Sequence, residues 1–199
     1  MMLIEETTVP DGALPVDDFK AHLRVGSGFT TDSLQDEVLR SFLRAALAAI
    51  EARTGKALYE RQFSYGVTAW RDAEAQVLPV APVRVITALK SIDSDGVETA
   101  LDAGSIWLEQ DPARPRLRSV GSCLPTIPQA GSVSIMFWAG FGPLWSDIPA
   151  DLRQAVFLLA SHYYEYRNET ALSEGCMPFG VSSLIERYRV FRVFGGGAR

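Results

Sequence analysis

Residues 31–55, TDSLQDEVLRSFLRAALAAIEARTG, predict a long amphipathic helix that ends at residue 54. From Leu34 to Ile50 the apolar residues recur about every four positions, which is the spacing of one helix face. A threonine or aspartate at the beginning can cap the helix, and Gly55 supplies the left-handed residue at which many helices end. This helix requires an apolar partner surface elsewhere in the chain.

A second long helix is expected over residues 149–167, PADLRQAVFLLASHYYEYR. Pro149 fits the first turn, and Asp151 suits the positive end of the helix dipole. At about 100° per residue the apolar side chains form two stripes on different sides. The first stripe contains Leu152, Val156, Leu159, Tyr163 and Tyr166, and the second contains Phe157, Ala160 and Tyr164. Such a helix either lies centrally or packs its own core on one side and another surface on the other.

Residues 57–141, between these helices, are typical of antiparallel β structure. β-Branched and aromatic residues alternate with polar ones, and prolines and glycines separate short runs. The strand candidates are QFSYGVTAW, VRVITALKSI, VETAL, SIWLE and SVSIMFWA, and Asp95-Gly96 indicates a hairpin turn.

The sequence therefore predicts an α+β fold in one domain over residues 1–199. A small helical bundle, with shorter helices near both ends of the chain, has an antiparallel β module inserted at about 57–141. The helical core comprises residues 15–56 and 147–188, and residues 189–199 form a flexible C-terminal tail.

Composition excludes several classes of protein. The chain has 199 residues and a net charge of −5, so it is a poor candidate for coating DNA through phosphate neutralisation. An acidic wall can, however, line a passage through which DNA slides. The longest uncharged run, residues 119–146, contains three prolines and four glycines, so we expect no membrane span.

No catalytic, metal or cofactor site is predicted. The chain lacks the nucleophile-elbow, phosphate-loop and H-x-x-x-H motifs. A dyad of His162 and Glu165 is geometrically possible, but no nucleophile accompanies it. His22 and His162, with two distant cysteines, would meet at a metal only by an accident of folding.

The C-terminal end differs from the rest in charge. From residue 186 onward there are four arginines and one glutamate, a side-chain charge of +3 in an acidic protein. Aromatic residues alternate with these arginines, and both types anchor interfaces. Three interpretations stay open: a last element packed on the parent domain, a segment that orders on a partner, and contact with nucleic acid.

Several stretches occur in one order: LPVDDFKAHLRV, AALAAIEARTGKAL, LPVAPVRVITALKSIDSDG, FWAGFG, DIPADLRQAVFLLASHYYEYRNE and MPFGVSSLIERYR. Over residues 8–192 this pattern resembles the head–tail connector, or adaptor, proteins of tailed bacteriophages and phage-like gene transfer agents. No single motif is chemically specific, but the combination is fairly specific to that group.

The resemblance implies a non-enzymatic protein of the particle neck, assembled in the bacterial cytoplasm. Such adaptors form a ring, commonly of twelve copies, beneath the portal protein. They extend the DNA channel without specific DNA binding and offer a surface to a tail-side neck protein. It further implies portal contacts by the C-terminal segment, here Arg187, Tyr188, Arg189, Phe191, Arg192 and Phe194. Phe157 and Tyr164 would then face a neighbouring subunit.

Two alternatives remain at this point. One is another neck or tail-completion protein, such as a stopper or terminator, although those more often lack two long helices. The other is a small DNA-binding protein that uses its basic tail, and its DNA affinity would fall steeply with salt.

Overall fold

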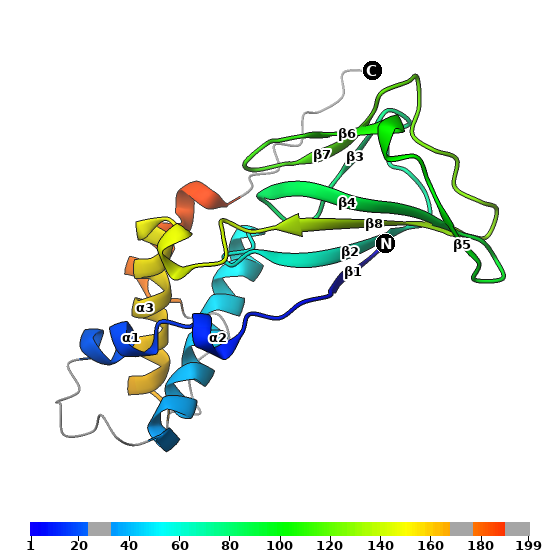
Figure 1. Ribbon diagram of the computed structural model, residues 1–199. Coiled ribbons are helices and arrows are strands. Elements are labelled where there is room, and N and C mark those ends of the chain that lie inside the picture. Colours follow the sequence, from blue (N-terminus) through cyan, green and yellow to red (C-terminus); the bar gives the residue numbers. More distant parts are fainter. Residues whose placement is uncertain (24–32, 168–176, 190–199) are drawn as a thin grey trace.

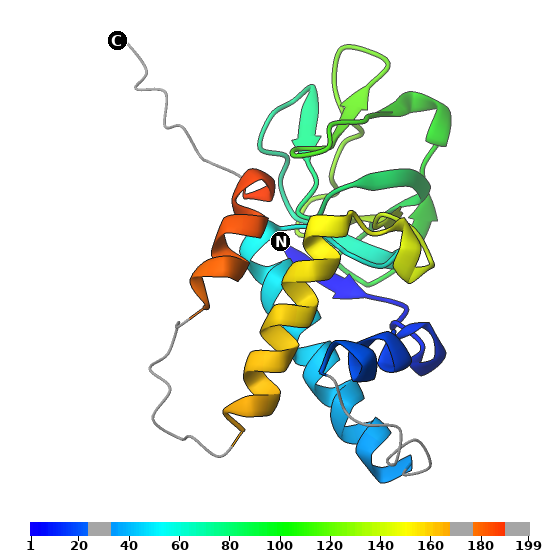
Figure 2. The ribbon, with the colours of Figure 1, turned by 90° about the vertical axis from the view of Figure 1, so that its left-hand side faces the viewer.

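The helices and the strands form two adjoining layers (Figure 1). The computed structural model describes residues 1–23, 33–167 and 177–189. In the helical layer, α3 (Ala150–Glu165) packs against both α2 (Ser33–Thr54) and α4 (Phe179–Ile185), and α1 (Val16–His22) packs on α2. Turning the molecule by 90° shows the β layer stacked at one end of these helices (Figure 2). The fold is therefore α+β, as the sequence predicts.

Helix α2 confirms the predicted helix at residues 31–54. Its core-facing residues Leu39, Leu43 and Ile50 are fully buried, whereas Val38 is exposed. The backbone N–H of Gly55 donates to the carbonyl of Glu51, and Gly55 has a φ of +66°, the left-handed conformation that ends the helix. The expected capping residues, Thr31 and Asp32, lie outside the described residues.

Helix α3 is two residues shorter than predicted at its C-terminal end. It begins at Ala150, so Pro149 occupies the N-cap position rather than the first turn. Leu152, Val156 and Leu159 form the buried core face, as expected. Tyr166 belongs to the same predicted stripe, but it follows the helix and is exposed, because the stripe extends beyond the last residue of the helix.

The β layer contains two antiparallel sheets. The five-stranded sheet has the order β1 (Met2–Glu5), β2 (Arg61–Val67), β8 (Ser132–Ala139), β4 (Val83–Ile92) and β5 (Glu98–Ala100). The three-stranded sheet has the order β3 (Ala75–Val77), β7 (Arg116–Ser119) and β6 (Ile106–Glu109). The predicted β4 and β8 agree with the structure at both ends, whereas β1, β3 and β7 were not predicted.

The predicted hairpin turn joins β4 to β5. The N–H of Gly96 donates to the carbonyl of Asp93 over 3.2 Å, and Gly96 has a φ of +81°. A glycine tolerates this positive φ without steric cost, which explains the Asp-Gly signal.

Each layer has a hydrophobic core of its own. The helical core gathers side chains from α1 to α4 around α3, with Leu58, Tyr59 and Ile148 from the connecting segments. The β core lies between the two sheets and includes Phe63 and Phe137, whose rings stack at 5.8 Å. Of the helices in the described part of the chain, none is both long and apolar enough to cross a membrane.

Candidate assembly surfaces

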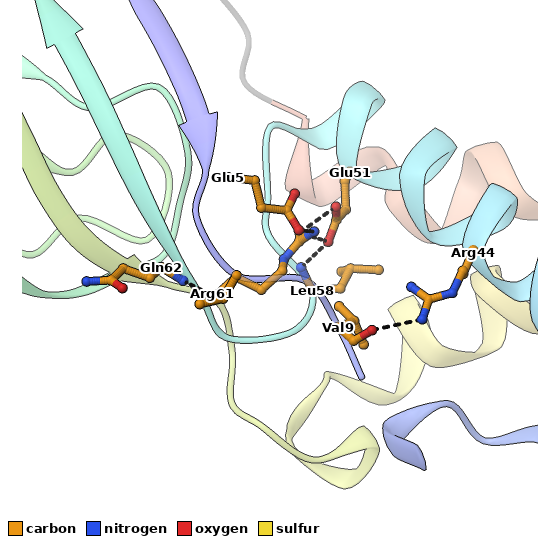
Figure 3. A network of polar contacts seen from close by, with 8 residues as sticks. Glu5, Val9, Arg44, Glu51, Leu58, Arg61 and Gln62 are labelled. Atoms are coloured by element: carbon orange, nitrogen blue, oxygen red, sulfur yellow. Dashed lines mark hydrogen bonds and ion pairs between the residues drawn. The ribbon is translucent and has the colours of Figure 1, made fainter. Parts of the chain in front are cut away.

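An ion-pair network around the buried Arg61 joins the two layers (Figure 3). Arg61 of β2 bonds through Nη2 to both carboxylate oxygens of Glu51 on α2, each at 2.6 Å. Its Nη1 bonds to Glu5 of β1 at 2.9 Å. The Glu51 carboxylate also accepts the backbone N–H of Leu58 at 2.7 Å. One arginine therefore links the N-terminal strand, the central sheet and the longest helix.

Burial sets the electrostatics of this junction. It raises the pKa of the Glu51 carboxyl, against the opposing charge of Arg61. The pKa of the Arg61 guanidinium is also raised, because Glu51 and Glu5 outweigh the effect of its burial. A buried charge without its partner is costly, so we expect the network to behave as a unit.

The N-terminal segment is held at two more points that Figure 3 shows. The backbone N–H of Gln62 donates to the hydroxyl of Thr7 at 2.9 Å. Arg44 of α2 donates to the carbonyl of Val9 at 2.8 Å. The first nine residues are thus attached to both layers.

Steric crowding near this junction explains the two glycines of the FWAGFG motif. Gly140 has a φ of +136°, and a Cβ there would collide with the backbone of Tyr59 and Glu60. A Cβ on Gly142 would collide with the side chain of Asp147, whose carboxylate accepts the N–H of Leu144 at 2.9 Å. Both glycines permit the close approach that leads β8 into α3.

The last described residues are anchored on the first turn of α3. The hydroxyl of Tyr188 donates to Oδ1 of Asp151 at 2.8 Å, and Nε of Arg187 lies 2.9 Å from Oδ2. The Tyr188 ring also meets Phe141 edge-on, with ring centroids 6.4 Å apart. We call Asp151, Arg187 and Tyr188 the C-terminal anchor.

The anchor alters the properties of its tyrosine. Burial raises the pKa of the Tyr188 hydroxyl; Arg187 opposes the shift, and the Asp151 carboxylate adds to it. Tyr188 therefore stays protonated, and it can continue to donate to Asp151, through the neutral pH range.

The predicted portal-binding residues fall into two groups. Arg187 and Tyr188 already contact Asp151, and Arg189 forms an exposed ion pair with Glu186 at 3.2 Å. Phe191, Arg192 and Phe194 lie outside the described residues. The sequence did not reveal the role of Asp151, because Tyr188 is 37 positions away.

The predicted subunit-interface residues both contact their own chain. The ring of Phe157 lies 5.7 Å from that of Phe19 and 5.1 Å from that of Trp145. Tyr164 meets Phe42 edge-on at 6.0 Å. Phe157 and Tyr164 are half-buried, so each keeps part of its ring at the surface.

The two histidines line one surface hollow of about 470 Å³, together with Ser161 and Glu165. His22 lies against Phe157 at 5.4 Å, and His162 lies against Tyr166 at 4.7 Å. Across residues 1–23, 33–167 and 177–189, no three histidine, cysteine or carboxylate side chains are grouped so that they could hold a metal ion. Each histidine ring thus packs against an aromatic ring.

Comparison with known proteins gives consistent matches among solved structures. A chain in the neck of an empty gene transfer agent particle, computed with C6 symmetry, is 54% identical, with a TM-score of 0.90 over 98% of this chain and 99% of that one. A chain in the virion of a native gene transfer agent is 54% identical over the same shares, with a TM-score of 0.87.

A third match comes from the neck of the native particle, computed with C12 symmetry. It is 52% identical, with a TM-score of 0.85 over 98% of this chain and 99% of that one. No family model matches the chain, and no curated protein matches it.

The fold and the matched structures together define a class, the structural proteins of phage-like particles. Identity above half, over nearly the full length of both chains, is more specific than a shared fold. The chain belongs to the head–tail neck, or connector, proteins of gene transfer agent particles.

Proposed function

We propose that this chain is an adaptor that forms a ring beneath the portal in the neck of a phage-like particle. The main support for this proposal is that the chain is 54% identical, over 98% of its length, to a chain in the neck of a gene transfer agent particle. The C12 symmetry of a related neck supports twelve copies per ring. The ring would extend the DNA channel, and the protein would act as a structural component rather than an enzyme, assembled in the bacterial cytoplasm.

In this proposal the C-terminal segment contacts the portal, and the C-terminal anchor fixes its base. Arg187 and Tyr188 hold the segment on Asp151. The portal contacts then fall to Arg189, Phe191, Arg192 and Phe194, whose residue types suit an interface. The opposite end of the ring is left for a tail-side neck protein.

The proposed ring also needs contacts between neighbouring subunits. The surface parts of Phe157 and Tyr164 are candidates for the helical layer, although both rings also pack within their own chain. The net charge of −5 suits a channel wall through which DNA passes without adhering.

Co-sedimentation with the portal ring of the same particle tests the proposal. The full chain is compared with a version that ends at Arg189, which keeps the buried Ile185 and the anchor residue Tyr188. We expect the full chain to sediment with the ring and the shortened chain to bind at least about tenfold more weakly, a loss of about 1.4 kcal/mol.

Other outcomes point to the alternatives. Failure of both chains to bind the portal overturns the adaptor role. Binding only to a portal that already carries another neck protein indicates a stopper. Affinity for DNA that falls steeply with salt indicates a DNA-binding protein.

A further inference from the structure

Among the described residues, the five-stranded sheet has one fully open edge, on β1, and one partly open edge, on β4. At one edge β1 pairs only with β2. At the other, β4 pairs with β8 with two register shifts, between Val83 and Val85 and between Ile86 and Ala88, and β5 covers its outer side only from Lys90 to Ile92. The stretch from Val85 to Ala88 is therefore open (Figure 1). Natural proteins usually protect such edges, because they pair readily with another chain.

The open edge of β4 faces a second open edge. In the three-stranded sheet β6 pairs only with β7. A surface hollow of about 240 Å³ separates β4 from β6, and its lining includes Val85, Ile86, Leu89, Ile106, Trp107 and Leu108. An extended segment in this groove would meet backbone groups on both sides and an apolar floor between them.

Both edges expose apolar side chains. All four residues of β1 are exposed, and Met2 reaches 63%. On the other side, Val85 is 49% exposed and Trp107 is 47% exposed. β1 and the stretch from Val85 to Ala88 contain no lysine or proline, although β4 has register shifts between Val83 and Val85 and between Ile86 and Ala88. The two edges are therefore chemically suited to cover each other.

Strand direction makes this pairing possible between identically oriented copies. Each step across the sheet from β1 through β2 and β8 to β4 is antiparallel, so β1 and β4 run in opposite directions. A second copy in the same orientation would thus bring its β1 antiparallel to the β4 of the first. A contact between two different surfaces closes into a ring when the rotation between successive copies divides the full circle, as the template of the portal would require here.

Charge supports the same antiparallel alignment. The exposed Glu6 follows β1, and Arg84 precedes the open stretch of β4. In an antiparallel pair the end of one strand meets the beginning of the other, so Glu6 would lie beside Arg84. Arg84 contacts Glu60 at 3.1 Å, and its side chain remains 52% exposed. The apolar Met2 to Ile4 would then lie along the apolar groove.

We propose that a second copy of this chain occupies the groove between β4 and β6, where its β1 adds to the open edge of β4. The contact rests on the proposed ring function and specifies how neighbouring subunits are joined in the β layer. Repeated around the ring, it links the five-stranded sheets of successive subunits.

Chemical crosslinking on the portal ring tests this contact. In a chain with Cys123→Ser and Cys176→Ser, the double variant Leu3→Cys/Val85→Cys is assembled on the portal and treated with a short bis-maleimide. We expect a ladder of crosslinked species beyond the dimer, because each subunit uses one cysteine toward each neighbour. The matched control Leu3→Cys/Val97→Cys moves the second cysteine to an exposed position in the β4–β5 hairpin and should give no ladder.

Mixing the two single variants sharpens the result. Leu3→Cys chains mixed with Val85→Cys chains should stop at dimers, since each chain then has one reactive edge. Normal portal binding without a ladder overturns the edge contact and leaves the ring function intact; this result is also expected if another neck protein fills the groove. If the natural chain does not bind the portal, the ring function and the contact both fall.

Discussion

The helical layer and the β layer both bury an apolar core, but they treat their backbone groups differently. A helix satisfies its own hydrogen bonds, so α3 can lie between α2 and α4 with only its side chains at the surface. A sheet satisfies all the backbone hydrogen-bonding groups only of its inner strands, so β1 and β4 keep unpaired groups at their open edges. The helical layer therefore gives the molecule a fixed frame, whereas the β layer keeps backbone groups that can still pair with another strand.

The first prediction is that the helical core and the β core unfold together as one cooperative unit. Leu152→Ala in the helical core and Phe137→Ala in the β core each remove a fully buried side chain. Each should lower the free energy of unfolding by about 3–5 kcal/mol. Far-UV circular dichroism reports α2 and α3, and in a chain with Trp145→Phe the fluorescence of Trp70, Trp107 and Trp138 reports the β layer.

Because Arg61 joins the layers, we expect both signals to change together in both variants. The exposed Val38→Ala serves as the control and should stay within about 0.5 kcal/mol of the natural chain. A variant that shifts only one signal would show that the layers unfold independently.

The second prediction separates the layers without removing core atoms. Arg61→Met leaves the buried Glu51 carboxylate without its partner and should cost about 3 kcal/mol of unfolding free energy. We expect the two spectroscopic transitions to diverge and residues 1–9 to become more sensitive to protease. Arg84→Met, which breaks an exposed pair with Glu60, is the matched control and should cost under about 1 kcal/mol.

The third prediction concerns the C-terminal anchor, which lies wholly within the helical layer. Tyr188→Phe removes the hydrogen bond to Asp151 and should cost about 1 kcal/mol. A dye attached near residue 199 should rotate more freely in this variant, as measured by fluorescence anisotropy. Tyr166→Phe, at an exposed position, provides the control. Unchanged anisotropy would contradict the anchoring role of Tyr188.

The smallest expected effect is on pH dependence. Burial raises the pKa of the Tyr188 hydroxyl above its unfolded value, so the folded state favours the protonated form. Its stabilisation is therefore complete below the unfolded pKa of about 10 and is lost as the pH rises through the folded pKa. The stability difference between the natural chain and Tyr188→Phe should shrink above about pH 10. A constant difference up to alkaline unfolding would argue against this hydrogen bond.

Long periodic segments were predictable, and short exposed ones were not. The four-residue spacing before Gly55 and the Asp95-Gly96 turn carry their signals locally, so α2 and the β4–β5 hairpin were predicted well. Strand β1 has four exposed residues and no polar alternation, and the residues that it pairs with in β2 lie 58 to 64 positions further along the sequence. Strand β7, RLRS, buries only Leu117. Such strands exist because of tertiary pairing, which a local pattern does not contain.

The candidate assembly surfaces were likewise predictable only where the signal is local in the sequence. Composition and alternation identified the C-terminal arginines and aromatic residues. Asp151 was assigned only to the helix dipole, because its partners Arg187 and Tyr188 approach it through the packing of α4 on α3. The open edges of β1 and β4 follow from strand order, which the sequence pattern did not specify.

The attachment of the first nine residues has a consequence for synthesis. Their partners are Arg44, Arg61 and Gln62, which leave the ribosome much later than the residues they hold. A nascent chain shorter than about 60 residues therefore has no template on which β1 can form. The edge strand becomes available only after β2 has been made, so a chain that still lacks β2 cannot present it to a neighbour.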